Sequence, residues 1–208
     1  MSFMVADDKK VEDSYLYDAF IGHPHVLRDR KWAEWLASAL ENCPALGLEP
    51  KAHPLLRKVF RDKSEQSEAD LQEDVKGALT ASRFLVVVCS RLAPRSKQIV
   101  REIDLFHQLG RSDRVLAVLT EGEPRESLPA ILLERYRAGQ SDDGVIDDEG
   151  PLAADVRPRA GFSLTKIQRL ARQRLTARVL GVPFAELSRI EAQSRRRGSQ
   201  TRARFRRF

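Results

Sequence analysis

Short apolar runs alternate along the chain with stretches in which apolar residues recur every three or four positions. The run Phe84–Cys89 is continuous and rich in β-branched residues, which is typical of a strand buried on both faces. Shorter runs predict strands at Tyr17–Ile21, at Leu55–Phe60 and at Val115–Leu119. A less apolar run at Leu152–Val156 predicts a fifth strand.

Apolar stripes at helical spacing lie between these runs. They predict helices through residues 32–40, 71–79, 99–106 and 164–179, the last of which ends at Gly181. Strand and helix therefore alternate as βαβ units, which predicts a parallel sheet covered by helices on both faces. With five strands, we expect an α/β fold of the flavodoxin-like kind with strand order 2-1-3-4-5.

The predicted winding indicates where a ligand would bind. In doubly wound sheets, ligands lie beyond the carboxyl ends of the strands, at the switch point beside the first strand. The segments that reach this edge are residues 22–28, 61–70 and 90–97. The sequence contains neither a Walker-type nor a GxGxxG segment, which excludes a glycine-rich phosphate loop of those kinds.

Two other kinds of site are not favoured at this edge. His23 and His25 stand close together, but no Cys or carboxylate accompanies them at ligand spacing, so we do not expect a metal site. Ser90 and Ser96 have no histidine near them in the sequence, so we do not expect a serine nucleophile either.

Charge is distributed unevenly along the chain. The 208 residues include 36 Lys+Arg and 30 Asp+Glu, which gives a net charge of +6. Residues 1–150 have a net charge of −6, residues 151–208 have one of +12, and seven of the last fourteen residues are Arg. This asymmetry indicates an acidic folded body with a basic arm. The sequence has no apolar run long enough to cross a membrane, and we expect Cys43 and Cys89 to be reduced thiols of a cytosolic protein.

Glu102 is the acidic residue that the pattern sets apart. It falls on the helix after the third strand, where it borders the apolar stripe formed by Ile99 and Ile103. An ordinary surface glutamate that pairs with Lys97 or Gln98 would explain it, because most helix carboxylates are solvated. The alternative is a carboxylate that serves a ligand at the carboxyl edge of the sheet.

Four ordered motifs point to a family. They are YDAFI at 17–21, VFRDKSE at 59–65, FLVVVCS at 84–90, and Ser96 followed by Arg101-Glu102-Ile103. In order and spacing they closely resemble the Toll/interleukin-1 receptor (TIR) domain, of the bacterial kind that heads larger signalling or defence proteins. The resemblance runs from about residue 14 to residue 133, and residues 151–156 and 180–184 resemble the end of that bacterial module.

The resemblance implies a chemistry as well as a fold. Many bacterial TIR domains hydrolyse NAD+ at the nicotinamide–ribose bond, and the catalytic glutamate of the family falls on Glu102. The substrate-binding residues that the resemblance implies are Gly22, His23, Arg61, Asp62, Ser96 and Gln98. Bond cleavage develops positive charge on the ribose, which an ionised carboxylate stabilises. We therefore expect NAD+ as substrate, no metal, no cofactor, and self-association with other TIR domains in the active form.

The arginines and the lysine near the start of the Glu102 helix leave two interpretations open. Arg91, Arg95 and Lys97 either meet the diphosphate of the substrate or simply solvate a loop.

The sequence also departs from the family pattern. Gln98 stands where family NADases usually carry an aromatic residue, often Trp, so hydrogen bonding replaces ring stacking. Gly22 and His23 replace the usual small-polar/aromatic pair, and loop 61–70 is acidic and lacks the glycine common there. These departures favour the alternative function, a weakly active or inactive TIR domain that acts as a self-associating interaction scaffold.

The expected organisation has three parts. They are a disordered segment at 1–13, a TIR domain at 14–182 (core 14–133, acidic loop 138–150, last strand and helix 151–182), and a basic tail at 183–208. The tail could be a solvated arm, a contact for nucleic acid or another acidic partner, or the approach to a membrane segment in a longer chain. Nucleic acid is the least favoured partner, and we expect a cytoplasmic location, with a membrane tether if the chain continues.

Overall fold

A sheet of parallel strands forms the centre of the structure. The computed structural model describes residues 15–42, 58–61, 73–138 and 152–193. The five strands in these residues are β1 (Tyr17–Gly22), β2 (Val59–Arg61), β3 (Ser82–Cys89), β4 (Val115–Leu119) and β5 (Leu152–Asp155). Their order is β2-β1-β3-β4-β5, and every neighbouring pair is parallel. This order confirms the predicted flavodoxin-like α/β fold.

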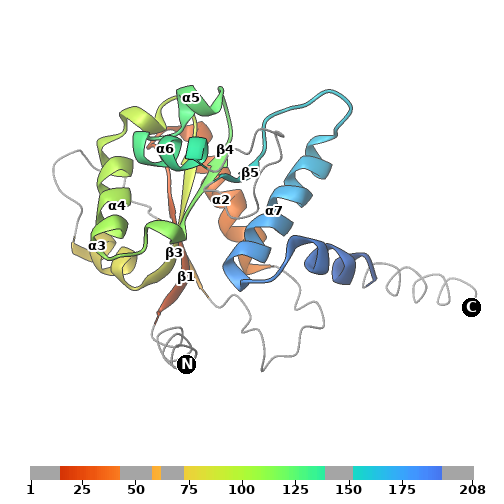
Figure 1. The fold of residues 1–208 in the computed structure, drawn as a ribbon, viewed down its shortest axis with the longest axis horizontal. Coiled ribbons are helices and arrows are strands. Elements are labelled where there is room, and N and C mark those ends of the chain that lie inside the picture. The colour runs from red at the N-terminus through yellow and green to blue at the C-terminus, as the bar shows by residue number, and fades with distance from the viewer. Residues whose placement is uncertain (1–14, 43–57, 62–72, 139–151, 194–208) are drawn as a thin grey trace, which may run out of the picture.

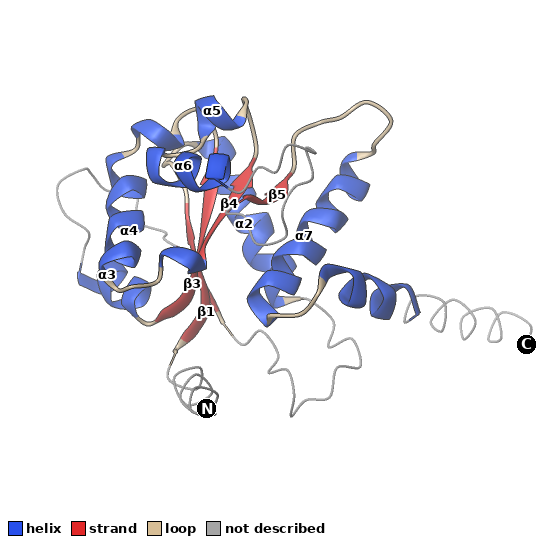
Figure 2. Cartoon of the chain, viewed as in Figure 1, coloured by secondary structure: helices blue, strands red, loops and turns tan. Residues whose placement is uncertain are grey.

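Helices cover the sheet on both faces. One face carries α2 (Leu27–Glu41) and α7 (Leu164–Leu180), and the other carries α3 (Glu73–Thr80), α4 (Lys97–Gln108) and α6 (Ala130–Ala138) (Figure 1). The short α5 (Pro124–Ser127) follows the carboxyl end of β4. Figure 2 shows the red strands enclosed between these two layers of blue helices.

The strand β4 explains why the central runs are apolar at every position. Its side chains alternate, so that Leu116 and Val118 pack in the core beneath α2 and α7. Val115, Ala117 and Leu119 join the second core, beneath α3 and α4. A central parallel strand is buried on both faces and therefore needs no polar positions.

The observed elements agree with the predicted ones at the centre of the sheet and differ at its margins. The predicted strand Leu55–Phe60 corresponds to β2 at Val59–Arg61, and its first residues lie outside the described ones. The short helices α5 and α6 were not predicted. The N-terminal segment 1–13, Cys43, most of the acidic loop and the end of the basic tail lie outside the described residues, so those statements stay predictions.

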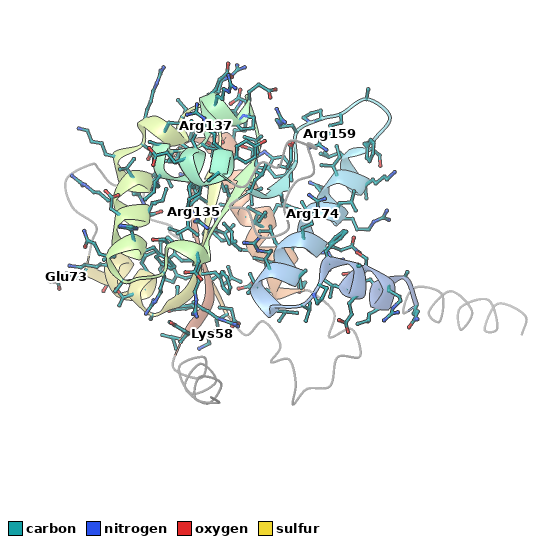
Figure 3. All side chains as sticks on the ribbon, in the orientation of Figure 1. Lys58, Glu73, Arg135, Arg137, Arg159 and Arg174 are labelled. Carbon is teal, nitrogen blue, oxygen red and sulfur yellow. The ribbon has the colours of Figure 1, made fainter. Side chains whose placement is uncertain are left out.

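The segment that follows α7 begins with a helix. Residues 184–193 are helical, and Leu187 is fully buried in a small core with Ala177 and Val182. The guanidinium of Arg174, labelled on α7 in Figure 3, lies 5.5 Å from the ring centre of Phe184. The predicted basic tail therefore starts with an element that packs on α7. Throughout the described residues, every helix is too short or too polar to cross a lipid bilayer.

Candidate functional site

The helix α4 begins at a side-chain cap and buries one face. The hydroxyl oxygen of Ser96 accepts a hydrogen bond from the backbone N–H of Ile99 at 3.4 Å, which satisfies one of the unpaired donors of the first turn. Ile99, Ile103 and Phe106 are buried against the sheet. Because position 102 lies one turn beyond Ile99 on the same side, this packing directs Glu102 towards the sheet.

Glu102 is completely buried, with 0% of its surface exposed. The amide nitrogen Nε2 of Gln98, one helical turn earlier, donates a hydrogen bond to its Oε1 at 3.0 Å. Burial of a carboxylate is costly, because an ionised group loses its hydration, so fully buried glutamates are rare. Glu102 therefore pairs with Gln98, as the simpler interpretation expected, but it is not the solvated surface residue of that interpretation.

The other oxygen of this carboxylate faces the backbone of β1. A Cβ atom built on Gly22 would overlap Oε2 of Glu102 and would lie 3.3 Å from its Cδ. Gly22 is the last residue of β1 and pairs with Val87 of β3. Since the chain winds outwards in opposite directions from β1 and β3, the carboxylate lies at the switch point of the sheet.

His23 follows Gly22 and is also buried, with 2% of its surface exposed. Its Nδ1 lies 3.0 Å from the carbonyl oxygen of Pro24, a hydrogen bond that requires the proton on Nδ1. The ring centres of His23 and His25 are 5.3 Å apart. Among the described residues, no group of three or more His, Cys, Asp or Glu side chains is arranged to hold a metal ion.

The structure brings some of the predicted site residues together and not others. Gly22, Gln98 and Glu102 are in contact, and the hydroxyl of Ser96 caps the same helix. Arg61 is the last residue of β2, and its Nη1 lies 2.8 Å from Oε1 of Glu34 on α2, which is the opposite face of the sheet from α4. Asp62 lies outside the described residues.

Sequence reasoning missed a second buried carboxylate at this edge. Asp29, in the first turn of α2, is 0% exposed, and its Oδ2 accepts a hydrogen bond from the hydroxyl of Ser90 at 2.6 Å. Burial raises the pKa of Asp29, although the Ser90 hydrogen bond and the charge of Arg28 oppose the rise. The only signal in the sequence was an Asp near a helix start, where the helix dipole favours negative charge. The hydrogen bond between Ser90 and Asp29 thus connects the end of β3 to α2.

Ion pairs connect the loops around the carboxyl edge. Arg28 pairs with Glu121, which follows β4, and hydrogen bonding to Arg28 lowers the pKa of Glu121. Arg91 pairs with Glu126 of α5 through its Nε at 3.1 Å. Arg91, one of the residues considered for the diphosphate, is thus paired within the protein itself.

A comparison with the profiles of protein families identifies the family of this chain. The profile of the TIR domain matches residues 20–147, which is more than half of the chain. The chain belongs to the TIR domain family. A search of curated proteins found no match to it.

The TIR match contains the site but not the whole fold. Gly22, Gln98 and Glu102 all lie within the matched residues. The match ends before β5 and α7, yet β5 pairs with β4 and α7 packs on the same core. Membership of the family implies interaction with other TIR domains in general.

Proposed function

We propose that this TIR domain hydrolyses NAD+ at the nicotinamide–ribose bond and that Glu102 is its catalytic residue. The observation that supports this most directly is the carboxylate of Glu102, buried against the backbone of Gly22 at the switch point. Ligands of doubly wound sheets bind at this position. An ionisable group buried there, on a helix with a solvated side available, is typical of a functional site.

The proposed reaction follows from the charge of the substrate. The bond between the ribose C1′ and the nicotinamide nitrogen breaks, and its electron pair leaves with the ring, which becomes neutral. Positive charge then develops on the ribose, as in glycoside hydrolysis, and the ionised carboxylate of Glu102 stabilises it. Water adds to C1′ and releases a proton to solvent, so the products are nicotinamide and ADP-ribose.

The other site residues in the described part of the chain have separate proposed roles. Gly22 leaves the carboxylate room beside the strand, and Gln98 hydrogen-bonds it. His23 is next to Gly22 in the chain. Ser96 holds the first turn of α4, so we propose that it acts on the site through the helix. Arg61 would have to break its ion pair with Glu34 before it could contact a substrate on the α4 face.

A second function, as a TIR interaction scaffold without turnover, is favoured by one observation. The carboxylate of Glu102 has no exposed surface, so it does not meet solvent in this conformation. A scaffold of this kind would assemble with other TIR domains and leave NAD+ intact.

The test measures nicotinamide released from NAD+ by the purified chain over a series of protein concentrations. We expect release that rises more steeply than protein concentration, because the family associates. In Glu102→Gln we expect release to fall by roughly 100-fold or more, as when a transition-state-stabilising group is removed. Glu134→Gln, which neutralises an exposed carboxylate on α6, is the matched control and should keep full activity.

Two results would contradict this proposal. Turnover that is unchanged in Glu102→Gln would remove Glu102 from the reaction. Concentration-dependent association, measured by light scattering, without nicotinamide release at any concentration would support the scaffold instead.

A further inference from the structure

The contact between Gln98 and Glu102 has a consequence for access to the site. To stabilise a ribose, the Glu102 carboxylate must meet the substrate, yet it is 0% exposed in this structure. Its Oε1 accepts the Gln98 hydrogen bond, and its Oε2 faces the backbone of Gly22. The structure therefore shows the carboxylate in a closed orientation.

Gln98 contacts this carboxylate from a position that solvent partly reaches. Gln98 is half-buried whereas Glu102 is fully buried, and the two residues are one turn apart on α4. Residues four apart on a helix contact each other directly, and such a contact breaks by side-chain rotation alone. The helix itself does not need to move, because the Ser96 cap and the buried Ile99 hold its first turn independently.

We propose that Gln98 is a positioning residue that holds Glu102 closed, and that release of their hydrogen bond opens the site. The effect on turnover rests on the proposed NAD+ hydrolysis, whereas the accessibility of the carboxylate does not. For a substrate that binds only the open orientation, the apparent Kd is the intrinsic Kd divided by the fraction of open molecules. Gln98 thus sets the resting activity of the site.

The direct test labels accessible carboxylates in the whole chain with a water-soluble carbodiimide and an amine, followed by peptide mass spectrometry. Gln98→Met removes the N–H donor but keeps a side chain of similar length and helix propensity. Gln98→Ala removes the donor and most of the side chain together. Gln108→Ala, at an exposed position of the same helix, is the matched control.

Two other carboxylates calibrate the labelling. Glu126, whose side chain is 53% exposed, reports full reactivity, and the buried Asp29 reports the closed fold. In the wild-type chain we expect Glu102 to label as little as Asp29. In Gln98→Met we expect roughly tenfold more label on Glu102, the change that loss of a hydrogen bond to a charged group produces. Gln98→Ala should label at least as strongly, and Gln108→Ala should resemble the wild type.

Two labelling results would overturn the inference. They are wild-type Glu102 that labels like Glu126, and Glu102 that labels no more in Gln98→Met than in the wild type while Asp29 shows that the variant is folded. Kinetics add an independent readout: we expect Gln98→Met to lower KM for NAD+ with little change in kcat. A raised KM would assign Gln98 to direct substrate contact instead.

Failure of this inference is distinguishable from failure of the proposed function. If labelling changes as expected but no variant releases nicotinamide, the closed contact stands and NAD+ hydrolysis fails. If the wild type releases nicotinamide through Glu102 but Glu102 is already accessible, hydrolysis stands and the closed contact fails.

Discussion

Gly22 and Glu102 lie against each other with no side chain between them. A Cβ at position 22 would overlap Oε2 of Glu102 and lie 3.3 Å from Cδ1 of Ile99. The last residue of β1 thereby leaves just enough room for the carboxylate of α4. The position of the proposed catalytic group depends on the absence of one methyl group.

Gly22→Ala should therefore displace the carboxylate of Glu102. We expect a loss of stability of about 1–3 kcal/mol, as for other overpacked interiors, together with loss of nicotinamide release. Urea unfolding and the NAD+ assay measure the two effects. Gly77→Ala is the control, because a Cβ there meets nothing within 4 Å and alanine favours its helix α3. Equal stability of Gly22→Ala and the wild type would contradict the close approach.

The raised pKa of Asp29 predicts a pH dependence of stability. Burial raises this pKa, so the folded state binds the Asp29 proton more tightly than the unfolded chain does. The resulting stabilisation is fully present below about pH 4, the usual pKa of Asp, and is lost as the pH rises through the raised value. The unfolding free energy of Asp29→Asn relative to the wild type should therefore increase with pH.

Urea unfolding over a series of pH values tests this, with Asp104→Asn as a control for loss of an exposed charge. A difference between Asp29→Asn and wild type that decreases with pH would show that the contacts with Ser90 and Arg28 outweigh burial.

Arg157 and Arg91 should differ in their contribution to stability. Arg157 hydrogen-bonds Asp155, whose side chain is 7% exposed, and the carbonyl oxygen of Gly122 at 2.9 Å. We expect Arg157→Met to cost about 2–4 kcal/mol, because it leaves a buried carboxylate without its main partner. Arg91→Met breaks only an exposed pair and should cost less than about 1 kcal/mol.

The ion pair between Arg157 and Asp155 predicts how the loss of stability in Arg157→Met varies with pH. Burial alone would raise the pKa of Asp155, but the hydrogen bonds from Arg157 and Arg159 outweigh it and hold this pKa below its usual value. That stabilisation is present above about pH 4 and is lost as the pH falls through the lowered pKa. The difference in unfolding free energy between the wild type and Arg157→Met should therefore decrease in acid. A difference that is constant with pH would show that Arg157 does not lower the pKa of Asp155.

Leu187 should hold helix 184–193 against α7. It is fully buried with Ala177 and Val182, so Leu187→Ala leaves a cavity that costs about 2–5 kcal/mol of local stability. We expect faster hydrogen exchange throughout residues 184–193 and unchanged exchange in β3. Glu186→Ala, at the exposed neighbouring position, is the control. Exchange in Leu187→Ala that matches the control would show that this contact does not hold the helix.

The elements of the sheet centre could be predicted because their signal is local. The run Phe84–Cys89 is continuously apolar because the strand is buried on both faces. The helix through Ile99 and Phe106 has an apolar stripe because only one of its faces is buried. Short elements were predicted less well: β2 has three residues and α5 has four, too few for a period to be evident.

Within the site, periodicity placed Glu102 beside the apolar stripe, and the family resemblance assigned it a role. Neither indicated that Arg61 turns towards Glu34, that Ser90 binds Asp29, or that residues 184–193 pack on α7. Each of these depends on which side chains of distant segments meet, and hydrophobic spacing carries no information about that.

The sequence by itself determined the alternation of strands and helices, because this follows from short-range patterns of burial. The usual winding of five such strands indicated their order, and the four ordered motifs indicated the family. Only the tertiary structure decided that Glu102 is enclosed between Gly22 and Gln98. Gly22 is eighty positions away in the chain, and its contact with Glu102 exists only once β1 and α4 are packed in their final positions.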